Sequence, residues 1–195
     1  AFYDHASEKL ITVGITGTKG KTTTCYYVRY ILDEYLKSID KNRSAFISSI
    51  DTYDGISEAR SSNTTPEALD LHKCFSNAVN SGISCIEMEV SSQALKYDRV
   101  YGVNFDIGCF LNIDVDHISP VEHMNFEDYF GAKLRLFDQC KISCINTDSK
   151  YFDKIKAYAS RSPKVITFGT KQEADVYGHD LCISLDSIEF KVRIT

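Results

Sequence analysis

Residues 13–25, which read Val-Gly-Ile-Thr-Gly-Thr-Lys-Gly-Lys-Thr-Thr-Thr-Cys, combine the residue types that bind phosphate. An apolar run before the loop predicts a buried strand and a helical pattern follows it, so Gly17 and Gly20 fall in the turn between the two. The backbone N–H groups of such a turn attract an anion, the ammonium of Lys21 reaches terminal phosphate oxygens, and the Thr22 hydroxyl can hold Mg²⁺. The stretch therefore predicts a phosphate-binding loop.

The loop differs from the usual P-loop, which has a glycine where this chain has Ile15. The spacing that fits is a shorter one, Gly-x-x-Gly-Lys-Thr over residues 17–22. The alternative is an ordinary glycine-containing turn with a surface lysine. The position of Gly-Lys-Thr-Thr between a strand and a helix favours phosphate binding.

Glu89 and His117 are further candidates for binding a metal ion. Glu89 stands near the end of an apolar strand predicted over 83–90, where nucleotide-binding folds place a second magnesium ligand; the alternative is a solvated acidic residue. His117 follows Asp116 in a predicted loop and serves either as a metal ligand or as a capping residue of a turn. In an open α/β sheet, ligands bind beyond the carboxyl ends of the strands, so we expect both side chains on the edge that carries the phosphate loop.

Lys133 is unusual because it falls on the apolar stripe of a helix predicted over 126–137, in line with Phe126, Phe130 and Phe137. A stem that packs on the apolar face while its charge stays in water is one explanation. The other is a lysine turned inward because its nitrogen has a function.

The bulk composition limits the function classes. Hydrophobic residues make up 43% of the 195 residues and charged residues 25%, as in an ordinary globular protein. The net charge of −5 argues against a nucleic-acid or anionic-membrane surface, and no apolar run is long enough to span a membrane. The seven cysteines are scattered, and Cys140 and Cys144 have no nearby histidine for a zinc site, which favours buried thiols and a cytoplasmic protein.

Predicted strands and helices alternate along most of the chain. Strands are predicted over 10–15, 43–50, 83–90, 105–111, 141–146 and 164–168. Helices are predicted after the phosphate loop, from Pro66 to Gly82 with Thr64 or Thr65 as the cap, and over 91–95, 126–137 and 149–158; a polar loop is predicted over 51–65. This alternation predicts an α/β fold with a doubly wound, mainly parallel sheet and helices on both faces. Three short strands, over 174–178, 181–185 and 188–194, predict a short antiparallel appendage at the C-terminus.

Taken in order, these motifs resemble the central, ATP-binding domain of the Mur ligases, and most closely the branch of tripeptide synthetases that adds the third residue of the peptidoglycan stem peptide. The resemblance covers nearly the whole chain. The matching segments are residues 14–24, 63–72, 88–92 with Arg99, Asn112 with Asp116 and His117, 132–133 with 136–137, and 145–148.

The resemblance implies that the domain binds ATP with Mg²⁺. It places Lys21, Glu89, His117 and Lys133 in the catalytic centre. The implied magnesium ligands are Thr22 and Glu89 for one ion, and His117 and a carbamylated Lys133 for the other. The implied nucleotide site is formed by Gly17, Thr18, Lys19, Gly20, Lys21, Thr22, Thr23 and Asn112.

The resemblance also implies the substrates, a UDP-muramyl peptide and an amino acid. In the family reaction, ATP activates the carboxylate of the acceptor, UDP-N-acetylmuramoyl-L-alanyl-D-glutamate, as an acyl phosphate. The amino acid then displaces phosphate to give an amide. The residues implied to hold the acceptor are Asn63, Thr64, Thr65, Ser91 and Arg99.

The chain departs from the family pattern in places. Lys19 stands where the family usually has Asn, Gln93 stands where it has His, and residues 118–128 differ from the usual stretch after Asp-His. We expect residues 1–195 to be a truncated central domain, without the uridine-binding and C-terminal ligase domains of the family, monomeric and unable to complete the reaction alone.

Three alternatives remain at this stage. The first is a divergent relative in the same superfamily that uses another carboxylate acceptor. The second is a P-loop kinase or GTPase, which predicts a guanine-reading Asn-Lys-x-Asp or a lid of arginines, and neither is clear in the sequence. The third is a nucleotide-binding module without turnover.

Overall fold

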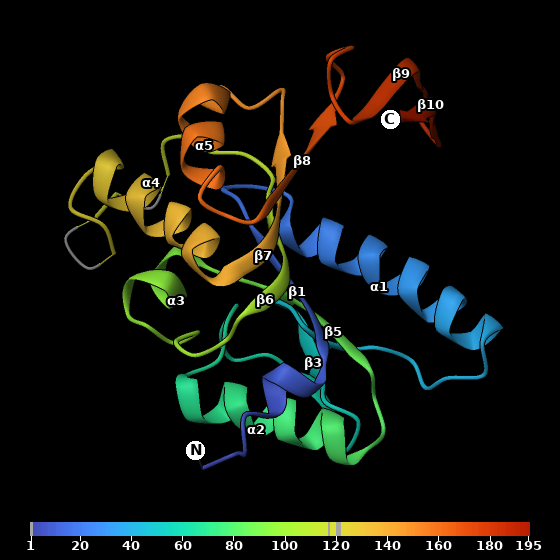
Figure 1. The fold of residues 1–195 in the computed structure, drawn as a ribbon, viewed down its shortest axis with the longest axis vertical. Helices are drawn as coiled ribbons and strands as arrows, with labels where there is room; N and C mark the ends of the chain where they lie inside the picture. The colour runs from blue at the N-terminus through green and yellow to red at the C-terminus, as the bar shows by residue number, and fades with distance from the viewer. Residues whose placement is uncertain (1, 117, 120–121) are drawn as a thin grey trace.

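The computed structural model of the chain describes residues 2–116, 118–119 and 122–195 (Figure 1). The strands are β1 (Ile11–Thr16), β2 (Ala45–Ile47), β3 (Asp51–Tyr53), β4 (Glu58–Arg60), β5 (Cys85–Glu89), β6 (Phe105–Phe110), β7 (Cys140–Asn146), β8 (Lys164–Gly169), β9 (Val176–Ile183) and β10 (Ile188–Ile194). The helices are η1 (Ala6–Lys9), α1 (Lys21–Ser38), α2 (Ala68–Asn80), α3 (Ser92–Lys96), α4 (Phe126–Leu134), η2 (Arg135–Gln139) and α5 (Phe152–Ala159), of which η1 and η2 are 3-10 helices.

The strands form one sheet in the order β10-β9-β8-β7-β6-β1-β5-β2-β3-β4. β1 lies between β5 and β6 and pairs in parallel with both, and β7 and β8 extend the parallel part beyond β6. The strand order therefore reverses at β1, which is where doubly wound sheets bind ligands. The predicted fold class is confirmed.

Helices cover both faces of the sheet, but unequally (Figure 1). α2, α3, α4 and α5 pack over the larger core, and α1 packs over β1 and β5 on the other face. In α2 the fully buried residues Leu71, Phe75 and Ala78 follow the spacing of one helix face. Beneath them Ile86 and Met88 of β5 are fully buried, as expected for a central parallel strand covered on both sides.

The segment predicted as a polar loop over 51–65 is only partly a loop. β3 pairs antiparallel with β2, and β4 pairs antiparallel with β3, so the chain folds back at the edge of the sheet. The Ser48 hydroxyl accepts hydrogen bonds from the N–H groups of Ile50 and Asp51, which closes the turn between β2 and β3. These strands are short and polar, so their sequence carries little apolar periodicity.

The start of α2 also differs from the prediction. Glu67 occupies the N-cap position and makes no side-chain capping bond. The Thr65 hydroxyl, predicted as a possible cap, instead donates to the backbone oxygen of Glu89 at 2.9 Å. A long-range bond to β5 has replaced the local one.

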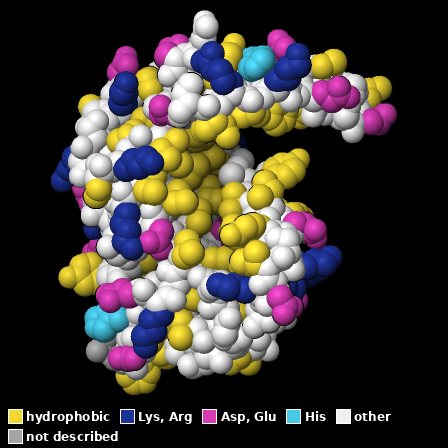
Figure 2. Space-filling view, turned by 45° about the vertical axis from the view of Figure 1, so that its right-hand side comes forward, with side chains coloured by type: hydrophobic (Ala, Val, Ile, Leu, Met, Phe, Trp, Pro, Cys, Tyr) yellow, Lys and Arg dark blue, Asp and Glu magenta, His cyan; other side chains and the backbone are white. Residues whose placement is uncertain are grey.

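The C-terminal region has two strands where three were predicted. β9 runs without a break through residues 178–181, pairs in parallel with β8, and pairs antiparallel with β10. The antiparallel appendage is thus an extension of the main sheet. Figure 2 shows hydrophobic side chains gathered in a hollow under this arm, and the exposed apolar residues of α1 and β10 include Tyr27, Ile31 and Phe190. Within the described residues, no helix is long and apolar enough to cross a membrane.

Candidate active site

The loop between β1 and α1 has the backbone geometry of an anion cradle. Gly20 adopts a positive φ of 84°, a left-handed conformation that costs an L side chain about 1–2 kcal/mol. A Cβ atom on Gly17 would lie 3.0 Å from Cβ of Leu111, so glycine also lets the loop approach the end of β6. α1 then begins at Lys21 and runs for 18 residues, with its N-terminal N–H groups directed toward the loop.

Two lysine side chains meet at this loop. Nζ of Lys21 donates to the backbone oxygen of Gly17 at 3.0 Å, and Nζ of Lys133 donates to the same oxygen at 2.9 Å. Lys133 is 1% exposed, so its amine lies inside the protein and does not extend into water. Burial, and next the charge of Lys21, hold the pKa of Lys133 well below its usual range. Of the two explanations given for Lys133, the structure supports the inward orientation and not a charge held in water.

Glu89 belongs to the same cluster. Burial lowers the pKa of Lys21, and the largest opposing effect on that pKa is the charge of Glu89. Oε1 of Glu89 accepts a hydrogen bond of 2.7 Å from the backbone N–H of Ser49, and the Ser49 hydroxyl shares one of 2.9 Å with the Thr22 hydroxyl. A carboxylate and two hydroxyls at the mouth of the loop are oxygen ligands of the kind that Mg²⁺ prefers, so these residues fit the predicted ion.

The second predicted ion is less fully described. Its ligands are Lys133 and His117, and His117 lies outside the described residues. Among the residues that the structure describes, no three or more His, Cys, Asp or Glu side chains group as a metal site. The described ligands predicted for the two ions are Thr22, Glu89 and Lys133. Only Glu89 among them is a His, Cys, Asp or Glu residue, so these ligands would not appear as such a group.

Asn112 holds the phosphate loop in place from the end of β6. Its Oδ1 accepts hydrogen bonds from the N–H groups of Thr18 (3.0 Å) and Lys19 (2.9 Å), and its Nδ2 donates to the oxygen of Lys19 (3.0 Å). The Lys19 side chain is exposed and forms an ion pair with Asp116 at 2.7 Å. Thr23 is exposed on the first turn of α1. Asn112 is the one predicted nucleotide-site residue that lies outside residues 17–23, and these hydrogen bonds attach it to the backbone of the loop.

A pocket of about 170 Å³ joins this loop to the residues predicted to hold the acceptor. Its walls are formed by Lys21, Asn63, Thr64, Thr65, Ser91, Ser92, Gln93, Arg99, Glu122 and Lys133. Thr65 organises one wall, because its hydroxyl accepts from the N–H of Ser91 at 3.0 Å and its backbone oxygen accepts from Arg99 at 3.3 Å. Arg99 also forms an ion pair of 2.8 Å with Glu67. The structure thus brings both lysines and the predicted acceptor residues into one pocket.

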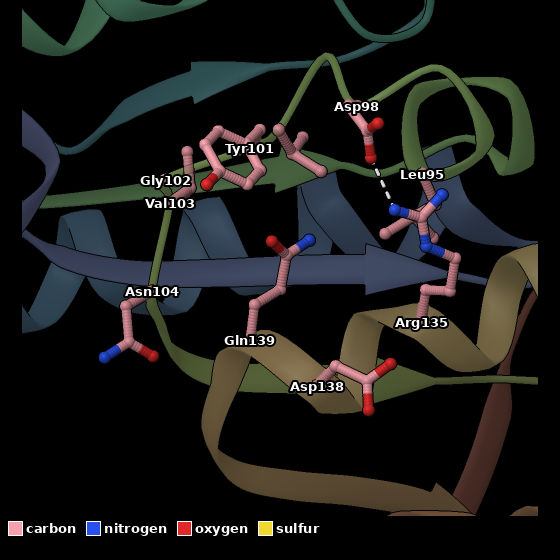
Figure 3. A pocket seen from close by; sticks show the side chains of 10 residues that line it. Leu95, Asp98, Tyr101, Gly102, Val103, Asn104, Arg135, Asp138 and Gln139 are labelled. Atoms are coloured by element: carbon pink, nitrogen blue, oxygen red, sulfur yellow. Dashed lines mark hydrogen bonds and ion pairs between the residues drawn. The ribbon is translucent and has the colours of Figure 1, made fainter.

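A larger hollow of about 550 Å³ lies elsewhere, between the loop before β6 and η2 (Figure 3). Arg135 and Asp98 form an ion pair across it, and Tyr101 and Gln139 line its walls. None of the described residues predicted for the site lines this hollow. Arg135 is paired with Asp98, and Asp138 with Arg161, so we place the candidate site at the smaller pocket.

Sequence reasoning missed three side chains of the site. Ser49 fell next to the stretch interpreted as a polar loop, and Tyr129 fell among helix core positions. The Tyr129 hydroxyl donates to Oγ1 of Thr18 at 3.1 Å and so connects α4 to the phosphate loop. His123 is 0% exposed and contacts Ser92 and Asp128. A buried histidine in a polar, irregular segment has no sequence periodicity that would reveal it.

Comparison with known proteins gives a consistent family. The profile of the Mur ligase middle domain matches residues 15–195. A UDP-N-acetylmuramoyl-L-alanyl-D-glutamate–L-lysine ligase from Enterococcus faecalis is 42% identical over 195 residues, which are 99% of this chain and 38% of that protein. A UDP-N-acetylmuramyl-tripeptide synthetase from Bifidobacterium longum is 38% identical over 179 residues, which are 91% of this chain and 34% of that protein. The chain therefore spans little more than a third of the length of these relatives.

Solved structures with a similar fold are consistent with this family. A UDP-N-acetylmuramoyl-L-alanyl-D-glutamate–2,6-diaminopimelate ligase superimposes with a TM-score of 0.74 at 28% identity, covering 94% of this chain and 37% of that chain. A folylpolyglutamate synthase from Mycobacterium tuberculosis complexed with ADP gives a TM-score of 0.66 at 11% identity, covering 98% and 48%, a likeness of fold alone. Since the family profile covers nearly the whole chain, the chain belongs to the Mur ligase family and matches its middle domain.

Proposed function

We propose that this chain is the ATP-binding middle domain of an ATP-dependent, ADP-forming ligase of peptidoglycan synthesis. The ligase joins an amino acid to UDP-N-acetylmuramoyl-L-alanyl-D-glutamate. The names of the Enterococcus and Bifidobacterium relatives support this acceptor. The cysteines, all of which are free thiols, support a reducing, cytoplasmic setting.

The phosphates of ATP bind at the loop over residues 17–22. Backbone N–H groups and the N-terminus of α1 attract the anion, and the ammonium of Lys21 neutralises charge as the γ-phosphoryl group moves. Asn112 and Tyr129 keep the loop in shape through their bonds to Thr18. Preorganisation of this kind spares the loop from rearranging when charge develops in the transition state.

Thr22 and Glu89 would hold one Mg²⁺, and His117 and a carbamylated Lys133 would hold a second. When bound, the ions neutralise phosphate charge and orient the transferring group. The lowered pKa of Lys133 supports carbamylation, because an uncharged amine has the lone pair that attacks CO₂. The product carries anionic oxygens beside the Lys21 ammonium, an attraction between opposite charges that the uncharged amine does not provide.

The acceptor lies in the pocket formed in part by Asn63, Thr64, Thr65, Ser91 and Arg99. The Arg99 guanidinium suits a carboxylate of the muramyl peptide, since it presents a planar pair of donors. Because the same pocket reaches Lys21 and Lys133, an acceptor carboxylate held there lies next to the γ-phosphate. Attack of this carboxylate on the phosphorus gives an acyl phosphate and ADP. The amino acid nitrogen then displaces phosphate.

The observation that carries the proposal is this single pocket shared by Lys21, Lys133 and Arg99. We would express the full-length protein that carries this domain and measure ADP formation with each substrate omitted in turn. L-lysine and meso-diaminopimelate serve as alternative amino acids. ADP formation is expected to depend on the muramyl dipeptide, and the Lys21→Met variant is expected to lose it. ATP turnover that is indifferent to the acceptor would contradict the proposed reaction.

A further inference from the structure

Ser92, His123 and Asp128 form a chain of hydrogen bonds beside the pocket, and the proposed function does not explain it. Nε2 of His123 lies 2.9 Å from the Ser92 hydroxyl, and Nδ1 of His123 lies 3.3 Å from Oδ2 of Asp128. His123 is 0% exposed and Ser92 is 6% exposed, so the contact between them is shielded from water, whereas the Asp128 side chain is 24% exposed. A serine, a histidine and a carboxylate in this order form the arrangement that moves protons in acyl-transfer enzymes.

The direction of the hydrogen bonds follows from Asp128. Its Oδ2 also accepts from Nζ of Lys96 at 2.7 Å and from the N–H of Met124 at 3.1 Å. Lys96 holds the pKa of Asp128 below its usual range, so the carboxylate is ionised and only accepts. Nδ1 of His123 therefore carries the hydrogen that points to Asp128. Nε2 is then the acceptor, and the Ser92 hydroxyl donates to it.

The charged groups around His123 favour a neutral ring. Burial is the largest effect and lowers the pKa of His123, the carboxylate of Asp128 raises it, and the cations Lys96 and Lys133 lower it again. The Tyr129 ring packs edge-on against the imidazole at 5.1 Å and adds no charge. A neutral imidazole with a free Nε2 lone pair can accept one proton, which Asp128 then stabilises.

Ser92 links this base to the pocket. It lines the pocket together with Ser91, Gln93, Lys21 and Lys133. Those lysines are the groups around which the acyl phosphate is expected to form. Nε2 of His123 does not itself line the pocket, so the Ser92 hydroxyl is the atom through which a proton reaches it.

We propose that Ser92 and His123 form a proton relay that accepts the proton of the incoming amino group during amide formation. This inference rests on the proposed function. The nitrogen lone pair forms the new C–N bond, and the bond from the acyl carbon to the phosphate oxygen breaks with its electron pair leaving on phosphate. One N–H proton passes to Oγ of Ser92 while the Ser92 hydroxyl proton passes to Nε2 of His123. Asp128 holds the resulting imidazolium.

The test compares two nucleophiles in the full-length ligase. Both nucleophiles lose an N–H proton as the C–N bond forms, but hydroxylamine is a much weaker base, so its adduct is more acidic, releases the proton to water and depends less on a positioned base. We expect Ser92→Ala and His123→Gln to slow amide formation about 100-fold, the usual contribution of a positioned base. Hydroxamate formation is expected to change less than about threefold in the same variants. His179→Gln, on the exposed arm, is the matched histidine control and is expected to change neither rate.

The outcomes distinguish a failure of the proton relay from a failure of the proposed ligase function. An equal fall in hydroxamate and amide formation means that Ser92 and His123 act only by holding α3 and α4 together, and overturns the relay. If Glu122→Gln alone gives the selective loss, the carboxylate on the pocket wall is the base and the relay is again overturned. If the unmodified enzyme forms neither ADP nor hydroxamate with the muramyl dipeptide, the proposed function itself fails.

Discussion

Replacing Lys133 by methionine separates the cost of burying an amine from its use in catalysis. Among the described residues, Nζ has one hydrogen-bond acceptor, the Gly17 oxygen at 2.9 Å, although an ammonium has three donors. Burying such an incompletely bonded group costs about 1–3 kcal/mol when the amine is neutral and more when it is protonated, and the bond to Gly17 returns about 1 kcal/mol. The Gly17 oxygen keeps its bond to Lys21 in the variant. We therefore expect Lys133→Met to be more stable by about 1 kcal/mol where the amine is neutral, and by more where it is protonated.

The pH dependence of this difference has a definite sign. The pKa of Lys133 in the folded protein lies well below 10.5, its value in the unfolded chain. Between these two pKa values the unfolded chain binds the extra proton, so the stability of the unmodified protein rises with pH. The advantage of Lys133→Met is thus largest below the folded pKa and falls toward about 1 kcal/mol as pH rises toward the unfolded pKa.

The assay is urea unfolding of the full-length protein and its variants across pH in buffers purged of CO₂. Lys37→Met, on the exposed surface of α1, is the control that should show no such trend. Lys133→Ala removes the packed stem as well and is expected to lose about 2–4 kcal/mol. A Lys133→Met protein that is less stable than the unmodified one at every pH would refute the interpretation of this lysine as a buried, strained amine.

Three further predictions concern the metal ligand, the loop and the acceptor. Glu89→Gln keeps an oxygen for the Ser49 N–H, so we expect a folded protein whose Mg²⁺-dependent ATP affinity, measured by calorimetry, falls more than about tenfold; an unchanged affinity would exclude Glu89 as a ligand. Gly20→Ala is expected to cost about 1–2 kcal/mol in urea unfolding because of the positive φ, whereas Gly131→Ala, in the open interior of α4, is expected to stabilise by up to about 1 kcal/mol. Arg99→Lys is expected to raise KM for the muramyl dipeptide about tenfold, or about 1.4 kcal/mol, and to leave KM for ATP unchanged; equal changes in both would place Arg99 outside the acceptor site.

The parts of the fold that were predictable are those with strong periodicity. β1, β5 and β6 are mainly apolar and lie in the middle of the sheet, and their order with the intervening helices determines a parallel sheet. β3 and β4 have three residues each, mostly polar, at the sheet edge, and the pairing of β3 depends on a turn at Ser48 that has no apolar pattern. The continuous β9 was divided in the prediction because His179 and Asp180 interrupt its apolar residues.

In the candidate site too, residues with a local sequence pattern were predictable, and residues placed by tertiary contacts were not. Lys21 and Thr22 were predictable because their backbone context, a strand followed by a glycine turn and a helix, is local in the sequence. Lys133 was conspicuous because a charge on an apolar helix face has few explanations. Ser49 and His123 join the site through tertiary contacts with Glu89 and Ser92, and neither contact leaves a trace in the nearby sequence.

The most direct test of the account follows the oxygen of the acceptor carboxylate. If the carboxylate attacks the γ-phosphate at the pocket between Lys21, Lys133 and Arg99, the oxygen that forms the P–O bond stays with phosphate when the amine breaks the C–O bond. The full-length ligase would be given muramyl dipeptide labelled with ¹⁸O in its carboxylates, together with MgATP and the amino acid, and the released phosphate analysed by mass spectrometry. The account predicts one ¹⁸O atom in each phosphate formed. Phosphate that carries no label, or that takes its new oxygen from solvent water, would contradict it.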